Sequence, residues 1–202
     1  MTTPATSGTA RRGRPGYDRS EVLRIAVELF NEQGYDATSV ADLAQRLGLS
    51  KSALYHHFDS KEQLLELALE SALSGLEGSL ESALAENDGV AEQLNRVISG
   101  AVEVLTAQRA QVTLLLRLRG NSPVEQAALE RRRAFDHRIM DLVRQAQQDG
   151  VIRTDVDTGI ATRLIFGMVN SITEWYRPGG PIDPQLLAAQ VIAIALDGLR
   201  PR

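Results

Sequence analysis

TSVADLAQRLGLSKSALYHHFDSK, residues 38–61, is the stretch that decides the fold of this chain. Val40, Leu43, Ala44 and Leu47 recur at the spacing i, i+3, i+4, i+7, which is the pattern of one apolar helix face. A short amphipathic helix is therefore predicted at the start of the stretch, with its apolar side against a core.

The residues around this helix predict where it begins and ends. Ser39 is a candidate N-cap, and Asp42, three residues later, completes a variant of the capping box. Gly48 supplies the backbone freedom that a helix end favours. Ser50 is a candidate cap for a second short helix. The stretch therefore predicts two helices joined by a tight turn.

The second helix has a buried side formed by Leu54 and Phe58. Its other faces carry side chains that are small, hydrogen-bonding, basic or aromatic: Lys51, Ser52, Ala53, Tyr55, His56 and His57. A short polar helix held in a helix–turn–helix fits the major groove of DNA. The alternative is a helical hairpin with only a structural role. Adjacent helical residues point about 100° apart, so the two histidines do not predict a metal site.

The longer run TSVADLAQRLGLSKSALYHHFDSKEQLL resembles the DNA-binding signature of the TetR family of bacterial transcriptional regulators. The agreement extends from about Tyr17 to Leu69. The resemblance implies an all-α fold in which residues 17–62 form a three-helix DNA-binding head with a helix–turn–helix. A larger helical domain for ligand binding and dimerisation would follow over residues 63–202. No cofactor is implied.

The resemblance also implies roles for residues in the head. Lys51, Ser52 and Ala53 open the recognition helix and are expected to face base edges. Ala53 has no hydrogen-bonding side chain, so base readout should fall mainly on Lys51 and Ser52. Other DNA contacts, to phosphates or to bases farther along, are expected from Ser39, Tyr55, His56, His57 and Lys61.

An N-terminal arm, residues 1–16, is rich in Thr, Ala, Gly, Ser and Pro and is predicted to be disordered. Within it, Arg12-Gly13-Arg14-Pro15 matches an AT-hook core, in which arginines lie in a narrow A·T-rich minor groove. Arg12 and Arg14 are therefore candidate DNA contacts. The alternative is a solvated basic tail that adds only non-specific attraction to phosphates.

Composition excludes several other classes of protein. The 202 residues contain no cysteine, which excludes disulfides and thiolate sites. No apolar run approaches the length of a membrane span, and the N-terminus lacks the apolar segment of a secretory signal, so a cytoplasmic protein without a membrane partner is predicted. No Gly-rich phosphate loop and no motif-placed Ser/His/Asp set is present, which argues against an enzyme.

The net charge of −4 is unevenly distributed along the chain. Residues 1–61 hold 8 Lys and Arg against 7 Asp and Glu, so the acidic excess lies in the remainder. Local charge governs contact with DNA, and an acidic total therefore does not contradict a DNA-binding head.

The rest of the chain shows helical periodicity without strand alternation. Gly75 and Gly78 lie in the middle of one long helix and predict either a bend or close packing against a neighbour. This helix would link the head to the remainder. The predicted helices cover residues 17–34, 61–86, 90–108, 110–119, 123–150, 155 or 157 to 176, and 183 onward.

The last two predicted helices are the expected dimer surface. Gly167 and Ser171 are small residues at i, i+4 and would permit close helix approach. The resemblance implies a four-helix bundle between two subunits. A dimer with two-fold symmetry is expected to bind a palindromic operator. The alternative is ordinary intrachain core. The candidate interface residues are Gly167, Met168, Ser171, Ile172, Trp175, Leu187, Val191 and Ile194.

The helices between about Leu94 and Asn170 are expected, from the resemblance, to surround a ligand cavity. The run GMVNSITEWYRPGGPID is similar, less closely, to the acyl-CoA-responsive TetR regulators. Such a ligand needs an apolar tunnel and cations for its phosphates. The tunnel candidates are Leu94, Ile98, Val102, Leu115, Leu118, Phe135, Ile139, Phe166 and Asn170, and the phosphate candidates are Arg117, Arg119, Arg131 and Arg138. The alternatives are plain core and a solvated helix face.

The sequence thus predicts a one-component switch. A homodimer would bind palindromic operator DNA and repress transcription until a small apolar effector, such as an acyl-CoA, releases it. Activation in place of repression fits the same residues. Two other readings stay open: a TetR-type repressor that responds to a drug-like ligand, and a helical acyl-binding module without DNA binding.

Overall fold

The computed structural model describes residues 18–86 and 88–200. Within these ranges it contains nine α-helices and no strand, which confirms the all-α fold class. The basic arm with Arg12 and Arg14 lies outside the described residues. The helices are α1 (Arg19–Gln33), α2 (Val40–Leu47), α3 (Lys51–Tyr55), α4 (Lys61–Ala85), α5 (Val90–Ala107), α6 (Arg109–Leu116), α7 (Pro123–Gln148), α8 (Thr158–Trp175) and α9 (Pro184–Asp197).

Helix boundaries follow the caps that the sequence predicts. Ser39 and Asp42 form the capping box at the start of α2, and Gly48 ends that helix in the left-handed conformation with φ 63°. The Ser50 hydroxyl accepts a hydrogen bond from the backbone N–H of Ala53 and begins α3. Because these signals are local, they place the turn between the two helices without help from distant contacts.

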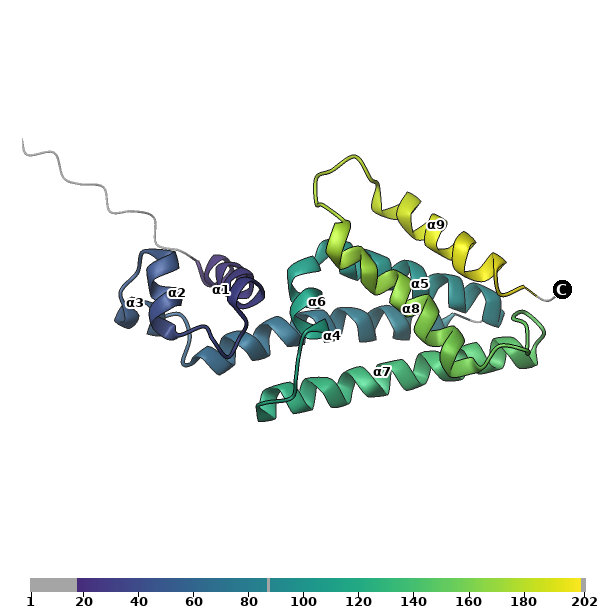
Figure 1. Cartoon of the computed structure of the whole chain (residues 1–202), viewed down its shortest axis with the longest axis horizontal. Coiled ribbons are helices and arrows are strands. Elements are labelled where there is room, and N and C mark those ends of the chain that lie inside the picture. The colour runs from purple at the N-terminus through teal and green to yellow at the C-terminus, as the bar shows by residue number, and fades with distance from the viewer. Residues whose placement is uncertain (1–17, 87, 201–202) are drawn as a thin grey trace, which may run out of the picture.

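Helices α1–α3 gather at one end of the molecule, and α4 passes from them into the group formed by α5–α9 (Figure 1). The 25 residues of α4 span about 37 Å at 1.5 Å per residue. The predicted domain boundary at residue 62 therefore falls at the beginning of a helix that continues unbroken into the larger part. Any movement of α4 must carry the small head with it.

Helices α4 and α5 pack closely because small residues face one another between them. A Cβ added at Gly75 would lie 3.1 Å from Cγ1 of Val104, and one added at Gly100 would lie 1.8 Å from Oγ of Ser79. A Cβ at Gly78 would meet nothing within 4 Å. Of the two predicted explanations, close packing therefore applies to Gly75.

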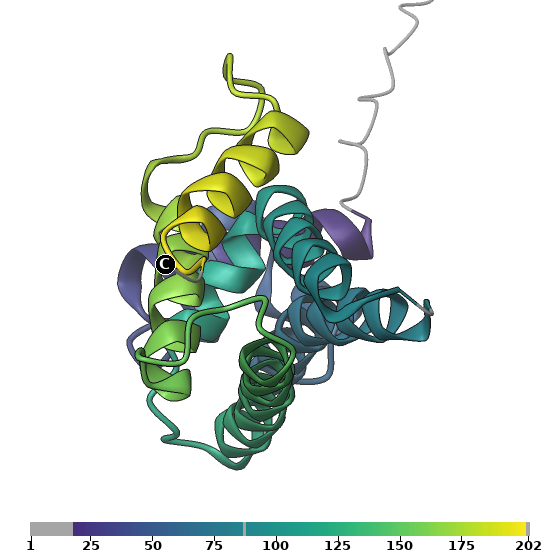
Figure 2. The same cartoon turned by 90° about the vertical axis from the view of Figure 1, so that its right-hand side faces the viewer.

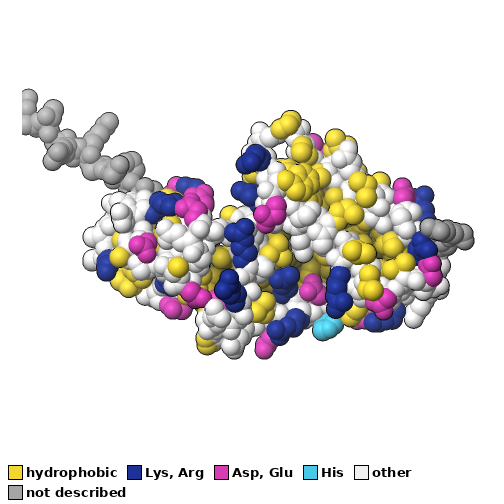
Figure 3. All heavy atoms as spheres, in the orientation of Figure 1, with side chains coloured by type: hydrophobic (Ala, Val, Ile, Leu, Met, Phe, Trp, Pro, Cys, Tyr) yellow, Lys and Arg dark blue, Asp and Glu magenta, His cyan; other side chains and the backbone are white. Residues whose placement is uncertain are grey.

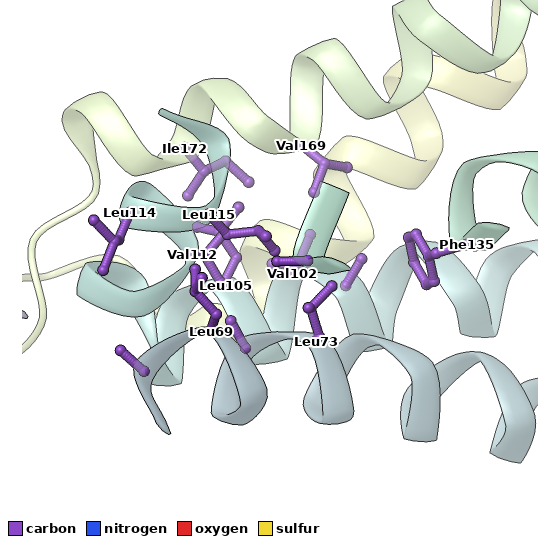
Figure 4. Packing of buried hydrophobic residues seen from close by; sticks show 14 of the residues in the cluster. Leu69, Leu73, Val102, Leu105, Val112, Leu114, Leu115, Phe135, Val169 and Ile172 are labelled. Carbon is purple, nitrogen blue, oxygen red and sulfur yellow. The ribbon is translucent and has the colours of Figure 1, made fainter. Parts of the chain in front are cut away.

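The larger part is a layered helical bundle. An end view places α8 between α7 and α9 (Figure 2). Its interior is aliphatic, and Figure 4 shows Leu105, Val112 and Leu115 clustered, with Phe135 from α7 set to one side. No helix in the described ranges is long and apolar enough to cross a membrane.

Candidate functional site

Helix α3 is anchored on one side and open on the others. Leu54 and, just beyond the helix, Phe58 are buried in the head core, and Arg19 lies 5.0 Å from the Phe58 ring centroid. Of the candidate recognition residues, Lys51, Ser52, Tyr55 and His56 are exposed, whereas Ala53 and His57 are half-buried. The helix therefore presents a mostly polar exposed surface that includes the aromatic ring of Tyr55.

The hydrogen-bond donors of Ser39 are used in the N-cap of its own helix, α2. Its hydroxyl and its backbone N–H both donate to Oδ2 of Asp42, at 2.6 and 2.8 Å. These hydrogen bonds lower the pKa of the Asp42 carboxyl, which keeps a negative charge beside the serine. In this structure the donors that would serve the predicted phosphate contact of Ser39 are used by Asp42, and the contact itself stays a prediction.

Lys61 joins two parts of the head. Its ammonium donates to the backbone carbonyls of Tyr35 and Thr38, both at 2.9 Å, and lies 4.1 Å from the Tyr35 ring centroid. The same ring packs edge-on against Phe30. Two of the three ammonium N–H groups are thus used inside the chain, so the expected phosphate contact retains at most one donor. Periodicity gives no sign of this role because the acceptors are backbone carbonyls far upstream.

A small cavity of about 30 Å³ lies in the interior of the larger part. Its lining comes from α4, α5, α6, α7 and α8 and is mostly apolar: Leu76, Ala101, Leu105, Val112, Leu115, Leu116, Arg132, Phe135, Asp136, Phe166, Val169 and Asn170. Four predicted tunnel residues line it, namely Leu115, Phe135, Phe166 and Asn170.

The other predicted tunnel residues have different positions. Leu94, Ile98, Val102 and Ile139 are fully buried and do not line the cavity, so they serve as ordinary core. Leu118 lies after the end of α6 and lines a hollow between the head and the larger part. Four of the predicted tunnel residues therefore line the cavity and five do not, and the contact of the four with a ligand stays a prediction.

A basic groove of about 440 Å³ lies between α7 and α8, beside the cavity. The groove and the cavity share Arg132, Asp136, Phe166 and Asn170. Groove residues outside the cavity include Arg133, His137, Met140, Gly159, Thr162, Arg163 and Gly167. The lining thus passes from aliphatic side chains to cationic ones, the arrangement that a ligand with an apolar end and an anionic end requires.

The charges of the groove are largely uncompensated. Arg132, Arg133 and Arg163 form no ion pair within residues 18–86 and 88–200. Burial raises the pKa of the one carboxyl among them, Asp136, while Arg132 and His137 act in the opposite direction. Three guanidinium groups are therefore available to an anion.

The four arginines that were predicted to bind the phosphates of the ligand do not line the groove. Arg131 donates to Glu70 and Glu77 on α4, at 2.5 and 2.7 Å, and Arg138 pairs with Glu81. Arg117 and Arg119 follow the end of α6, and both line the hollow beside the head. The arginines that line the groove are Arg132, Arg133 and Arg163, and a phosphate-binding role for either set stays a prediction.

A signal in the sequence separates the two faces of α7. Arg131 and Arg138 are seven residues apart, so they lie on one stripe of α7, and both pair with glutamates of α4. Arg132 is about 100° away from Arg131 and belongs to the other face.

Helices α8 and α9 expose an apolar face, seen as hydrophobic side chains gathered over both helices in Figure 3. Leu164 and Ile194 are 65% and 66% exposed, and Leu186 is 58% exposed. Among the candidate interface residues, Gly167, Ser171, Trp175 and Ile194 are exposed and Met168 is half-buried. We call Ile160, Leu164, Trp175, Leu186 and Ile194 the α8/α9 face.

Three candidate interface residues point inward instead. Ile172, Leu187 and Val191 are buried within the chain, so they are core residues and not interface residues. Sequence reasoning missed Ile160 and Leu164, although their spacing with Gly167 and Ser171 follows one helix stripe.

Comparisons with known proteins agree with this architecture. Residues 22–68 match the model described as bacterial regulatory proteins, tetR family, and residues 87–199 match the tetracyclin repressor-like C-terminal domain. The transcriptional repressor KstR2 of Rhodococcus jostii RHA1 is 32% identical over 200 residues, which cover 97% of this chain and 96% of KstR2. The chain belongs to the TetR family. It is thus a DNA-binding transcriptional regulator and not an enzyme, as the sequence predicted.

Solved structures of TetR regulators extend the comparison. A TetR-family regulator from Streptomyces coelicolor A3 is 45% identical, with a TM-score of 0.83 over 89% of this chain and 91% of its own. KstR2 of Mycobacterium tuberculosis, described as a ketosteroid transcriptional regulator, is 29% identical, with a TM-score of 0.83 over 94% and 98%. AibR shares the fold at 22% identity, with a TM-score of 0.70 over 88% of this chain and 97% of its own.

Replacement of Lys61 by Met keeps the aliphatic stem and removes the ammonium. Hydrogen bonds to charged groups each contribute about 1.5–3 kcal/mol, and the carbonyls of Tyr35 and Thr38 would lose their donor. We therefore expect Lys61→Met to lower the free energy of unfolding by about 2 kcal/mol, measured by urea denaturation. Lys51→Met is the matched control: Lys51 is exposed, and its substitution should change stability by less than about 0.5 kcal/mol. Equal losses would contradict the role given to Lys61.

Proposed function

We propose that this TetR-family regulator binds a palindromic operator as a homodimer, represses transcription there, and is released by a coenzyme A thioester. The observation that carries the proposal is the apolar cavity that adjoins a groove with three unpaired arginines. An acyl group suits the cavity, and the phosphates of coenzyme A suit the groove.

DNA recognition is assigned to α3. Its exposed polar residues offer a base-reading surface, and a helix of this size enters a major groove. Lys51 is exposed at the first position of the helix and has no partner among the described residues, so its donors are free for a guanine. This supports a DNA-binding function over an acyl-binding module without DNA.

Lys51→Ala tests the base-reading assignment. We expect it to weaken binding to the operator by about 1–3 kcal/mol and to leave binding to random DNA nearly unchanged. Fluorescence anisotropy with both DNAs at one salt concentration measures the two affinities. If the loss were equal on both, Lys51 would be a phosphate contact and base readout would fall to other residues of α3.

Dimerisation is assigned to the α8/α9 face. Large exposed aliphatic side chains gathered on two neighbouring helices mark an interaction surface in a protein of this size. Gly167 and Ser171, exposed on the same stripe of α8, allow a second helix to approach closely. Two copies related by a two-fold axis would bury this face and present two α3 helices to DNA.

Leu164→Asp should break the dimer. The substitution introduces a charge into the centre of the proposed interface, where it would be desolvated without a partner. We expect monomers in sedimentation equilibrium and a loss of tight operator binding. Ala134→Asp, at an exposed position on α7, is the control and should stay dimeric. A dimeric Leu164→Asp protein would move the interface elsewhere.

The connection between effector and DNA runs through α7 and α4. The groove lies on one face of α7, and the Arg131 and Arg138 ion pairs fasten another face to α4, which begins in the head. A ligand wedged between α7 and α8 therefore acts on the helix that carries the head. To shift the protein almost completely out of its DNA-binding state, the effector must bind the other state more tightly by about 5.5 kcal/mol. AibR, which shares this fold, was crystallised with isovaleryl coenzyme A and operator DNA, so the fold accommodates both.

Release of the operator complex by thioesters tests the effector class. We expect coenzyme A thioesters to displace the protein from DNA and the matching free acids to have no effect, because only the thioesters bring phosphates to the groove. Arg133→Gln should raise the thioester concentration needed by about tenfold, which corresponds to the loss of one charge-assisted contact.

Arg144→Gln is the matched control for this experiment. Arg144 also lies on α7 but pairs with Asp141 and does not line the groove, so its loss should leave release unchanged. Release by free acids as effective as by thioesters, or by an uncharged drug-like compound alone, would contradict the proposed effector class.

A further inference from the structure

Two aromatic rings stand at the junction of cavity and groove. Phe135 on α7 lines only the cavity, whereas Phe166 on α8 lines both spaces. Their ring centroids are 6.2 Å apart and their planes meet at 88°, an edge-to-face arrangement that is favourable for aromatic pairs. Phe166 is thus the side chain that separates the interior from the groove and is itself held by Phe135.

The space behind this pair is small. An apolar cavity of about 150 Å³ holds a benzene molecule, and the cavity here is about 30 Å³. Its far walls cannot easily retreat, because Leu105, Leu115 and Val169 are each about 1% exposed and packed on every side. The group that enters must therefore be short unless the aromatic wall moves.

A polar group lies at the same junction. Asn170 lines both the cavity and the groove, and its side-chain amide forms no hydrogen bond within the described ranges. An amide N–H there suits a carbonyl oxygen, which in a thioester lies between the acyl chain and the anionic remainder. From the apolar cavity through the Asn170 amide to the cationic groove, the lining thus follows the order acyl chain, carbonyl and anionic remainder of an acyl thioester.

We propose that Phe166, braced by Phe135, is a size filter that admits only the shortest acyl groups to the cavity, whose volume of about 30 Å³ corresponds to roughly one water-sized group. The inference rests on the proposed function and adds the effector's chain length and the residue that sets it. Removal of the Phe166 ring would enlarge the apolar space at the junction of cavity and groove, which longer or aromatic acyl groups could then fill.

Calorimetric titration tests the filter on the full-length protein. The ligands are acetyl-, propionyl-, butyryl-, octanoyl- and benzoyl-coenzyme A, with coenzyme A itself as reference. For the unsubstituted protein we expect at least tenfold tighter binding of the best short thioester than of octanoyl- or benzoyl-coenzyme A. Phe166→Ala should tighten binding of the two larger ligands at least tenfold and abolish the preference.

Two further variants serve as a second test and as a control. Phe166→Leu keeps an apolar side chain and should relax the preference partly; it decides the question if thermal melting shows that Phe166→Ala is unfolded. Met140→Ala alters a residue that lines the groove and not the cavity, so the preference for short acyl groups should persist.

The outcomes separate the filter from the proposed function. Equal binding of short and long thioesters by the unsubstituted protein would overturn the filter and keep the effector class. A short-chain preference that survives in both Phe166 variants would overturn the assignment to Phe166. Absence of binding for every thioester, with operator binding intact, would overturn the effector class and the filter together.

Discussion

The pairing of Arg131 with Glu70 and Glu77 is the interaction on which the rest of this structure depends. One guanidinium on α7 holds two carboxylates on α4, and its hydrogen bonds lower the pKa of the Glu70 carboxyl. An exposed ion pair alone adds little stability. Its importance here is geometric: it lies on the face of α7 that meets α4, and so leaves Arg132 and Arg133 on the face that lines the groove. The groove and the head are thus joined through α7 and α4, beside the direct packing of α1 on α6.

Much of the fold was predictable because its signals are local. Capping by Ser39, Ser50 and Asp183, together with the left-handed Gly48, depends on residues only a few positions apart. Apolar periodicity gave the helices within a few residues of their bounds, except at the end of α6, where the apolar run continues into the loop that carries Leu118. The exposed surface of α3 was likewise readable, since Leu54 and Phe58 alone define its buried side.

The errors share a different cause. Periodicity shows that a helix has an apolar face but not which neighbour covers it, so Ile172 and Val191 were assigned to a partner although they pack within the chain. The hydrogen bonds of Lys61 to two backbone carbonyls could not be foreseen either, because such acceptors leave no pattern in a sequence, and its contact with DNA stays a prediction. Arg131 and Arg132 are one position apart, which on a helix is a change of face, and periodicity did not show which of them meets α4. Each error concerns contacts between elements, and the structure supplies that information.

The close approach of α4 and α5 gives α4 the mechanics of a lever. Because Gly100 leaves no room for even a Cβ beside Ser79, the two backbones are pinned near that point and sliding along each other is blocked. The arm from Ser79 to Lys61 is about 27 Å long at 1.5 Å per residue. A tilt of about 5° at the pin then moves the head by about 2 Å. In the proposed dimer, opposite tilts of the two subunits would double that change and so alter the spacing of the two α3 helices.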